Sequence, residues 1–440
     1  MEFISTNEGI ESFIRQVKED GNANHLILGE AGSGKTEIIR RIMERSKDVV
    51  CLAPTGIASN NITDAGRGIL SQTIHRFFHL STQISTYENI RIYPKSYLLY
   101  RQIRTLIIDE ISMVRSDVFN AIDSIMRRCG DADRPFGGKQ VLIFGDFRQL
   151  PPVVDDPKAE RYLELVYGGR FAFHTRAWKD AGFKIHMLNT SFRHRDEDFR
   201  SFLHKLHEGH LDMEAARKMA VEPNNLEILG KDMERVCLCS RRANAYWING
   251  NMLDRINGEV IELHGSVAGV YPDSEQPTEL HMRLKVGCKV MTLVNSTNDT
   301  PQNGYVNGSM ATVIGKGKDY LMVRTIDGNE HMLHPETWTH WAYELVIDGD
   351  DAFITQIPDG YFTQYPVQIA YAMTIHKAQG LTLNKAYLDI GYNPCFASGQ
   401  LYTALSRVHS FQDIMLNRSL SQEDVKVDAA VEEFYAQIDH

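Results

Sequence analysis

The chain has 440 residues, of which 43% are hydrophobic and 24% charged, and its formal net charge is −10. This length allows two or three domains with a core each, and the composition is that of an ordinary globular protein. No run approaches the roughly 18–20 apolar residues of a membrane-spanning helix, and the first residues lack the basic leader of a targeting segment. We therefore expect no membrane partner and a cytoplasmic location.

The acidic net charge argues against binding of nucleic acid, because contacts to phosphates need positive charge. A protein with a negative net charge can nevertheless carry a basic groove. Part of the acid falls in the C-terminal tail, where we expect it to repel little elsewhere. Six scattered cysteines suit a reducing compartment. The close pair Cys237 and Cys239 lacks the second pair of a zinc site, and is predicted to lie in a buried strand.

The first half of the chain alternates apolar runs with helix-like stretches. The runs are HLILG, VVCLAP, RTLIIDE and KQVLIFGD. Continuous runs of this kind predict strands buried on both faces of a parallel sheet. Such a sheet presents functional groups at the carboxyl ends of its strands. The sequence therefore predicts an α/β fold with its chemistry at one sheet edge.

The segment GEAGSGKT matches the pattern G-x-x-x-x-G-K-[ST] between an apolar strand and a predicted helix, EIIRRIMERS. Its glycines let backbone N–H groups surround phosphate oxygens, and the helix N-terminus adds partial positive charge. In this pattern Lys35 contacts the β- and γ-phosphates and Thr36 ligates Mg²⁺. The predicted phosphate-binding loop runs from Gly29 to Thr36, and its candidate cofactor-binding residues are Gly29, Ala31, Gly32, Ser33, Gly34, Lys35 and Thr36.

Two further predicted strands end in candidate catalytic groups. LIIDE delivers Asp109, a candidate Mg²⁺ ligand, and Glu110, which can orient and deprotonate an attacking water. VLIFGDFRQLPPV ends in Gly145-Asp146 and then Gln149, whose amide can both donate and accept and so can sense a γ-phosphate or its attacking water. With the loop, these groups predict hydrolysis of ATP with Mg²⁺ as cofactor.

A second series of apolar runs begins near KIHML and resumes with VQIAYAM and KAYLDI. Between them, residues 302–360 form short alternating segments with turns at Asp327-Gly328 and Asp348-Gly349, which predict a small inserted antiparallel β-barrel. Residues 80–101 look strand-like and turn-prone, and are expected to form a hairpin or other small insertion. We expect one α/β unit over 1–185 and a second over 186–301 and 361–440.

Motifs along nearly the whole chain, from Leu26 to about Val408, resemble those of a known family. GEAGSGKT, APTGIAS, TIHRFF, DEISM, GDFRQLPPV, FRH, TIHKAQG and ALSRV follow in the order of the superfamily-one helicases. They look most like the Pif-type branch (petite integration frequency), which is related to RecD and the phage Dda helicase. The stretch from Ser116 to Asp146 resembles the Pif-type signature between the second and third motifs.

The resemblance implies two RecA-like domains with ATP held in the cleft between them, a wedge insertion in the first and an SH3-like barrel in the second. Arg193 and Arg407 match the two arginine fingers of the family, and both are expected in the second unit. A planar guanidinium suits phosphate oxygens. By the same analogy Gln379 and Gly380 connect the ATP cleft to the DNA track.

Several motifs are candidates for contact with single-stranded DNA. Backbone N–H groups and hydroxyls after a strand can hold a phosphodiester, and aromatic rings can stack on bases. One of the two phenylalanines in TIHRFF is expected in the core, and either can be that one; the turn at Asn307-Gly308 is equally well a plain hairpin turn. The candidates are Pro54, Thr55, Gly56, His75, Phe77, Phe78, Asn307, Thr374, His376 and Lys377.

The chain departs from the family at the glutamine that normally precedes the phosphate loop and reads the adenine edge. The corresponding region here is TNEGIESFIRQ, in which the first glutamine is Gln16. Either Asn7 substitutes for the missing residue or selectivity for the base is weak. Use of nucleotides other than ATP is therefore plausible.

The resemblance implies an ATP-dependent DNA helicase that translocates 5′→3′ on single-stranded DNA and unwinds duplex or structured DNA, in the class that serves replication, repair, recombination and telomere maintenance. Its polarity rests on the resemblance alone. The expected partners are single-stranded DNA and 5′-tailed duplex, with G-quadruplexes and RNA–DNA hybrids as further candidates, for a monomeric motor. The alternatives are an RNA helicase or remodeller and an NTPase switch or loader that binds DNA without unwinding it.

Overall fold

The computed structural model describes residues 2–4, 6–64, 67–81, 83–86, 90–154, 156–189, 192–194, 196–296, 305, 307–348, 351–391, 395 and 397–438. The chain forms two compact units. The first comprises Met1–Arg193, Trp341–Ile357 and Val427–His440, and the second comprises His194–His340 and Pro358–Lys426. None of the described helices is long and apolar enough to cross a membrane.

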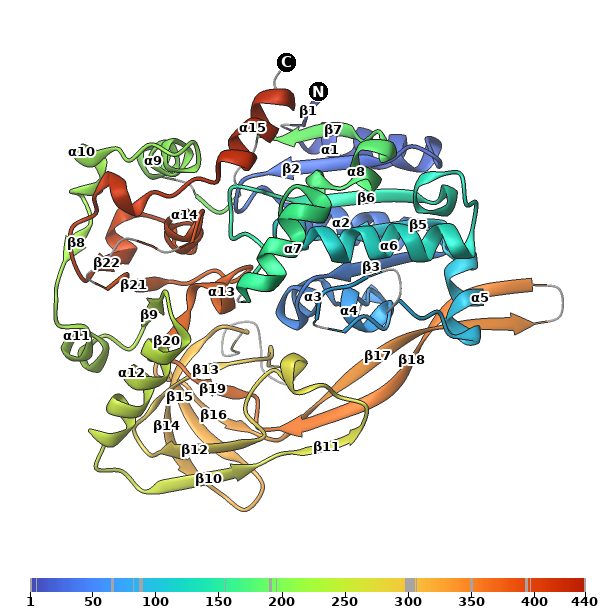
Figure 1. Ribbon diagram of the computed structural model, residues 1–440. Coiled ribbons are helices and arrows are strands. Elements are labelled where there is room, and N and C mark those ends of the chain that lie inside the picture. Colours follow the sequence, from blue (N-terminus) through green and yellow to red (C-terminus); the bar gives the residue numbers. More distant parts are fainter. Residues whose placement is uncertain are drawn as a thin grey trace. The chain divides into compact units, whose positions relative to one another are not determined.

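The first unit is built on a seven-stranded sheet in the order β1-β7-β2-β6-β5-β3-β4, in which the neighbouring strands run parallel (Figure 1). Its strands are β1 (Glu2–Ile4), β2 (His25–Gly29), β3 (Val49–Ala53), β4 (Gln72–Thr73), β5 (Thr105–Ile108), β6 (Gln140–Gly145) and β7 (Lys184–Leu188). Its helices are α1 (Asn7–Glu19), α2 (Lys35–Arg45), α3 (Gly56–Ile62), α4 (Ile74–Phe77), α5 (Pro94–Gln102), α6 (Ser116–Cys129), α7 (Pro157–Tyr167), α8 (Arg176–Ala181) and α15 (Ala429–Ile438).

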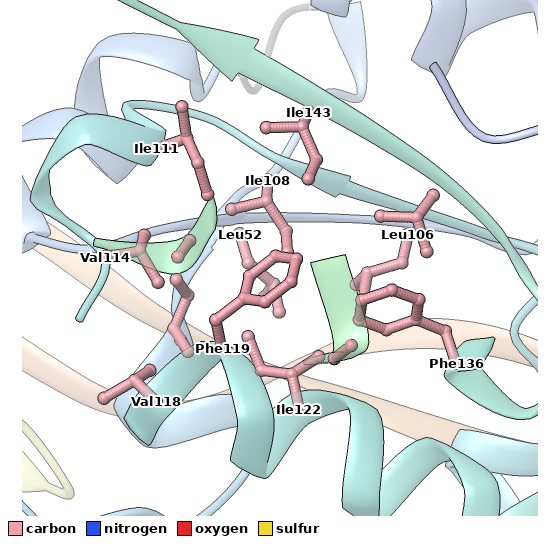
Figure 2. Packing of buried hydrophobic residues seen from close by; sticks show 14 of the residues in the cluster. Leu52, Leu106, Ile108, Ile111, Val114, Val118, Phe119, Ile122, Phe136 and Ile143 are labelled. Atoms are coloured by element: carbon pink, nitrogen blue, oxygen red, sulfur yellow. The ribbon is translucent and has the colours of Figure 1, made fainter. Parts of the chain in front are cut away.

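Alternate residues of the central strands enter two separate hydrophobic clusters. One face of β5 contributes Leu106 and Ile108, which pack with Phe119 and Ile122 of α6, as Figure 2 shows. The opposite face contributes Ile107 to a cluster with residues of α1 and α2. Because successive strand side chains point to opposite faces, a strand covered by helices on both sides must be apolar throughout. The prediction from the apolar runs is confirmed.

The second unit contains a smaller parallel sheet in the order β20-β9-β21-β22-β8. Its strands are β8 (Ala220–Val221), β9 (Arg235–Cys239), β20 (Ala372–Thr374), β21 (Lys385–Asp389) and β22 (Ile414–Leu416). Its helices are α9 (Glu197–His207), α10 (Met213–Ala216), α11 (Asn225–Lys231), α12 (Arg242–Asp254), α13 (Ile375–Ala378) and α14 (Gln400–Leu405).

The close cysteine pair lies in β9, and both thiols are buried, as predicted. The Sγ atoms of Cys237 and Cys239 lie 3.7 Å apart. A carboxylate oxygen of Asp389 lies within 4.8 Å of both thiols, so the three residues form a group that could hold a metal ion. The Asp389 carboxylate already accepts hydrogen bonds from Asn225 Nδ2 at 3.1 Å and from the Gly391 amide at 3.0 Å.

Antiparallel strands complete the second unit, except that the segment Trp341–Ile357 of these strands belongs to the first unit and not, as expected, to the insertion in the second. A five-stranded sheet has the order β16-β15-β14-β13-β19, a two-stranded sheet pairs β10 with β12, and a three-stranded sheet has the order β11-β18-β17. The bounds are β10 (Val260–His264), β11 (Ser266–Gly269), β12 (His281–Lys285), β13 (Lys289–Thr292), β14 (Met310–Lys316), β15 (Leu321–Thr325), β16 (Glu330–Leu333), β17 (Glu336–Asp348), β18 (Asp351–Gln364) and β19 (Val367–Ile369). The expected fold class, parallel α/β sheets with an antiparallel insertion in the second unit, is confirmed.

Several expected boundaries are wrong. KIHML forms β7, which pairs with β1 and β2 in the first sheet, so the first unit extends past residue 185 to Arg193. The antiparallel region starts at β10, well before residue 302. VQIAYAM divides between antiparallel β19 and parallel β20. An apolar run reveals a buried strand but not the sheet that it joins.

Three other expectations from the sequence have three different outcomes. Among the described residues of 80–101 there is no strand, and α5 begins where Pro94 occupies a first helical position. The turn at Asp327-Gly328 is confirmed between β15 and β16, and Gly328 adopts a φ of 89°. Gln302, the expected start of the insertion, and Gly349 of the other expected turn lie outside the described residues.

The C-terminal segment also departs from expectation. We expected residues 361–440 in the second unit, but those from Val427 onward belong to the first. Helix α15 buries Val431, Phe434 and Tyr435, which a helical period of three to four places on one face. Phe434 stacks on Phe173 with ring centroids 4.7 Å apart, which explains why this helix packs on the first unit's core.

A buried histidine pair joins β2 to β7. His25 Nδ1 lies 2.9 Å from His186 Nε2, and the rings stack at 5.2 Å. Phe13 of α1 packs against both rings. Among the described residues, His25 Nε2 has no hydrogen-bond partner. Burial and the neighbouring imidazole lower the pKa of His25 from 6.5 to about 4.

This pair predicts a pH-dependent stability. Between pH 6.5 and about 4 the unfolded chain binds a proton at His25 that the folded chain excludes. The free energy of unfolding should therefore fall as the pH is lowered through this range, and His25→Leu should flatten the slope. Urea denaturation followed by circular dichroism across this range measures it, with the exposed His210→Gln as control. A His25→Leu slope as steep as the parent's would contradict the assignment.

Candidate nucleotide-binding site

The phosphate-binding loop joins β2 to α2. Gly32 and Gly34 have φ values of 80° and 90°, in the left-handed region that favours glycine. Gly34 is the N-cap of α2 and has no side chain to cap it, so the first backbone N–H groups of this helix remain available to an anion. A Cβ on Gly29 would come within 2.6 Å of Ser33 Oγ. These positions require glycine, and the structure has a strand-to-helix loop at the predicted residues, whose binding of phosphate stays a prediction.

The charged group of the loop is Lys35, the first residue of α2. Its Nζ donates hydrogen bonds to the carbonyl oxygens of Gly29 at 2.6 Å and Glu30 at 3.1 Å. The ammonium therefore lies inside the curve of its own loop. Thr36 follows it in the first turn of α2 and is half-buried.

Asp109 stands directly after β5, and its side chain is only 5% exposed. Its amide donates to the carbonyl of Leu52 at 2.9 Å, which fixes the backbone at the sheet edge. Among the described residues, Asp109 Oδ1 has no hydrogen-bond partner. Burial and the charge of Glu110 raise the pKa of Asp109 to about 7. A buried carboxylate oxygen without a donor suits a cation, so Asp109 and Thr36 fit the Mg²⁺ role that their sequence positions predict.

Glu110 has a backbone conformation that is unusual for a residue with a side chain. Its φ is 50° and its ψ is 48°, and it begins the short 3₁₀ helix Ile111–Met113. A non-glycine residue in the left-handed region costs on the order of 1–3 kcal/mol, and such strain occurs often at functional sites. The conformation agrees with the catalytic role predicted for Glu110, which stays a prediction.

Gln149 follows β6 and is 4% exposed. Its Nε2 donates to Asp146 Oδ2 at 3.2 Å, and its amide N–H donates to the Asp146 carbonyl at 3.1 Å. The hydrogen bond to Asp146 holds the Nε2 end of the side-chain amide, and the carbonyl oxygen Oε1 is the atom of this group that can accept a hydrogen bond from a water molecule. Sequence reasoning noted Asp146 but did not give it this orienting role.

The segment FRH places two residues against the phosphate loop. The Phe192 amide donates to the Gly32 carbonyl at 2.9 Å, and a Cβ on Gly34 would lie 3.2 Å from the Phe192 ring. A Cβ on Gly32 would lie 2.6 Å from Arg193 Cβ. Arg193 therefore belongs to the first unit, and the expectation that both arginines lie in the second unit is wrong. The sequence analysis did not single out Phe192, although the FRH motif to which it belongs was noted there.

Arg407 lies in the second unit at the end of α14 and is 2% exposed. Its guanidinium donates to the Thr403 carbonyl at 2.9 Å, the Leu381 carbonyl at 3.5 Å and Ser406 Oγ at 2.7 Å. These three acceptors belong to the same unit as Arg407. Gln379 is also buried here and ends α13, and Gly380 follows it with a φ of 83°.

Two threonines among the DNA candidates occupy matching places in the two units. Thr55 follows β3 and caps α3 by accepting from the Ala58 amide at 3.2 Å. Thr374 ends β20 and caps α13 by accepting from the Lys377 amide at 3.2 Å. Each thus presents a strand-to-helix turn at the carboxyl edge of a parallel sheet. Their neighbours Pro54, Gly56 and His376 are half-buried, and Lys377 is exposed.

Both phenylalanines of TIHRFF are buried. Phe77 is 4% exposed and Phe78 is 1% exposed, whereas one ring was expected at the surface. Both pack on Tyr100 of α5, with ring centroids 5.3 and 5.2 Å away. Helix α4 ends at Phe77, so the next residue turns back into the same cluster. Both rings therefore belong to the core and are not exposed for stacking on the bases of DNA. His75 of the same motif is half-buried.

Asn307 is exposed, and its amide donates to Asn295 Oδ1 at 2.7 Å. Gly308 follows with a φ of 93° and leads into β14, so a turn exists here as predicted. At the other end of the chain, Asn7 is exposed at the first position of α1, which Thr6 caps. Gln16 lies within the same helix.

Comparison with known proteins agrees with this geometry. A family model described as PIF1-like helicase matches residues 6–217. The human ATP-dependent DNA helicase PIF1 is 29% identical over 424 residues, which cover 93% of this chain and 60% of the human protein. The chain therefore spans about three fifths of the length of that relative.

Two solved structures resemble the whole chain. Pif1 of Bacteroides sp. in complex with ADP-AlF4 has a TM-score of 0.84 and 29% identity, covering 99% of this chain and 97% of that one. Bacteroides Pif1 in complex with ADP-AlF3 and single-stranded DNA is 30% identical with the same coverage and a TM-score of 0.68. With this identity over nearly the whole of a solved Pif1 chain and a matching family model, the chain belongs to the PIF1-like helicase family.

Proposed function

We propose that this chain is an ATP-dependent DNA helicase that moves 5′→3′ on single-stranded DNA. The observation that carries the proposal is the buried Asp109 carboxylate, whose Oδ1 has no partner among the described residues, at the sheet edge that also bears the phosphate loop. Membership of the PIF1-like family supports the same activity, since a relative is named an ATP-dependent DNA helicase and another was solved with single-stranded DNA.

In this proposal each group of the first unit has one task. The Lys35 ammonium exchanges its bonds to loop carbonyls for oxygens of the β- and γ-phosphates. Thr36 and Asp109 hold Mg²⁺, which neutralises charge on the phosphates when bound. Glu110 takes a proton from the attacking water, and Gln149 orients that water through Oε1. Gly29, Ala31, Gly32, Ser33 and Gly34 supply the surrounding backbone.

Arg193 and Arg407 are proposed as the two cationic ligands of the transferred phosphoryl group. Arginine suits this role because its planar donors match phosphate oxygens. For Arg407 the proposal requires a change of rotamer, because its present donors face Thr403, Leu381 and Ser406. Gln379 and Gly380, next to the DNA candidates of α13, are proposed to couple nucleotide state to DNA grip.

The proposed DNA contacts are the two threonine-capped turns with their neighbours and, in the inserted sheet, Asn307. Phe77 and Phe78 are removed from this set because their rings are buried. We propose single-stranded DNA and 5′-tailed duplex as substrates, G-quadruplexes and RNA–DNA hybrids as further ones, and a monomer as the active form. All six cysteines are free and buried, which supports a cytoplasmic location.

The polarity assay tests this function. We expect single-stranded DNA to stimulate ATP hydrolysis, and the protein to unwind duplexes with a 5′ tail but not those with a 3′ tail. Fluorescence unwinding and coupled ATPase assays measure both, with an RNA strand as competitor. A hydrolysis rate unaffected by DNA would refute the motor, and stronger stimulation by RNA would favour an RNA helicase instead.

Lys35→Ala should reduce ATP hydrolysis by at least about 100-fold, because it removes the positioned cation that stabilises charge on the phosphates. Steady-state ATPase with single-stranded DNA measures the loss. Lys47→Ala, at an exposed lysine beyond α2, is the matched control and should retain the parental rate. Equal losses in both variants would mean that lysine removal disturbs the fold rather than the chemistry.

Asp109→Asn should separate activity from stability. At pH 8 the buried carboxylate, with a pKa of about 7, is largely charged, and its Oδ1 has no hydrogen-bond partner among the described residues. Removing that charge should raise the Tm without nucleotide or Mg²⁺ by about 2–4 °C, on the order of 1 kcal/mol, while hydrolysis is lost. Differential scanning calorimetry measures the Tm, and the exposed Asp133→Asn is the control. A lowered Tm would show that Asp109 stabilises the fold.

A further inference from the structure

Helix α15 is anchored on the first unit although the chain that leads to it, Pro358–Lys426, belongs to the second. Phe434 packs on Phe147 at 5.0 Å as well as on Phe173. At the start of the helix, Asp428 pairs with Arg170 at 3.4 Å. The helix is thus fixed by an apolar face and an ion pair, and its remaining polar groups can be placed with respect to the same unit.

Two of those polar groups contact the segment that carries Gln149. Glu432 accepts from Arg148 Nε at 3.0 Å. One turn further on, the ring of Tyr435 lies under the Arg148 guanidinium, 4.3 Å from its carbon to the ring centroid. The Tyr435 hydroxyl donates to Asp146 Oδ1 at 3.3 Å. Helix α15 therefore holds both Arg148 and Asp146.

The Asp146 carboxylate connects the helix to the catalytic amide. Its Oδ1 receives the Tyr435 hydroxyl and the Arg148 amide, the latter at 3.1 Å. Its Oδ2 receives Gln149 Nε2. A carboxylate held through one oxygen keeps the other in a fixed direction, so the Gln149 side chain inherits its orientation. Burial and the nearby Asp146 charge raise the pKa of Tyr435 well above its usual value, so the hydroxyl is protonated and can donate at neutral pH and in alkaline solution.

We propose that Tyr435 is a positioning residue for ATP hydrolysis: acting through Asp146, it fixes the Gln149 amide so that Oε1 faces the attacking water. The proposal rests on the proposed function of Gln149 and adds to it a residue from the far end of the chain. Glu432 supports the same arrangement by holding Arg148 beside Tyr435.

Tyr435→Phe tests the proposal, because it removes the hydroxyl and keeps the ring under Arg148. We expect kcat of DNA-stimulated hydrolysis to fall about 5- to 10-fold, as for the loss of one hydrogen bond of ordinary strength, with the KM for ATP unchanged. Glu433→Gln, on the same helix with a side-chain contact to Gln437, is the control and should keep the parental kcat. A parental kcat in Tyr435→Phe would overturn the proposal.

A double-mutant cycle separates positioning from general structural support. In a Gln149→Ala background Tyr435→Phe should cause no further loss, because the group that it positions is absent. Equal losses in both backgrounds would overturn the proposal. Glu432→Gln gives the same cycle with the Tyr435 ring and hydroxyl intact, should Tyr435→Phe not fold; it should lower kcat in the parent and not in Gln149→Ala.

A readout without turnover distinguishes failure of this proposal from failure of the proposed function. The side-chain amide resonance of Gln149, identified by its absence in Gln149→Ala, should shift in Tyr435→Phe and not in Glu433→Gln. An unshifted resonance would overturn the positioning role even in an active enzyme. If the parent hydrolyses no ATP, the function fails, yet the shift still decides whether Tyr435 orients Gln149.

Discussion

The parallel register of the first sheet is the constraint on which the site depends. Leu28 pairs with Gly145, Ile108 pairs with Ile143, and Gly29 pairs with Leu188. Parallel strands in this register end at one edge, so the residues that follow them emerge together. The phosphate loop, the two acidic residues after β5, the sensor segment and FRH all follow these strand ends. A shift of the register by one residue would also move each side chain of the shifted strand to the opposite face of the sheet.

Burial of this sheet on both sides restricts where polar groups can stand. Inside the strands a polar atom would lie between two hydrophobic clusters, so the chemistry is confined to the edge. Even there Asp109 is 5% exposed, and Glu110 adopts a φ of 50°. Both features destabilise the free protein locally, and the large apolar core around β5 and α6 offsets them (Figure 2). A cation at this edge would supply a ligand-binding partner to Asp109 Oδ1, which has no hydrogen-bond partner among the described residues.

The sequence was sufficient for the groups that follow strands directly. A continuous apolar run and the loop pattern predicted the strand at Gly29, the turn to Lys35 and the position of Asp109, because the backbone alone places them. The sequence was insufficient where packing between distant segments determines which strands are neighbours and which side chains are buried. The KIHML run shows a buried strand but not its neighbours. Phe77 and Phe78 are adjacent, so no hydrophobic periodicity indicates which ring faces the core. Their contacts with Tyr100 in the structure reveal that both are buried.

Gln149 differs from the other catalytic groups in what supports it. Lys35 begins a helix and Asp109 follows a strand, so hydrogen-bonded backbone fixes both. Gln149 lies beyond the end of β6 at Gly145, in a segment without helix or strand, and needs lateral support. That support comes from α15, whose acidic residues looked inert in sequence because their charge only added to the total. Glu432 instead forms an ion pair with Arg148, so this acidic residue of α15 helps to hold the segment that carries Gln149. The group least fixed by the sheet is the one that depends on the chain's last helix.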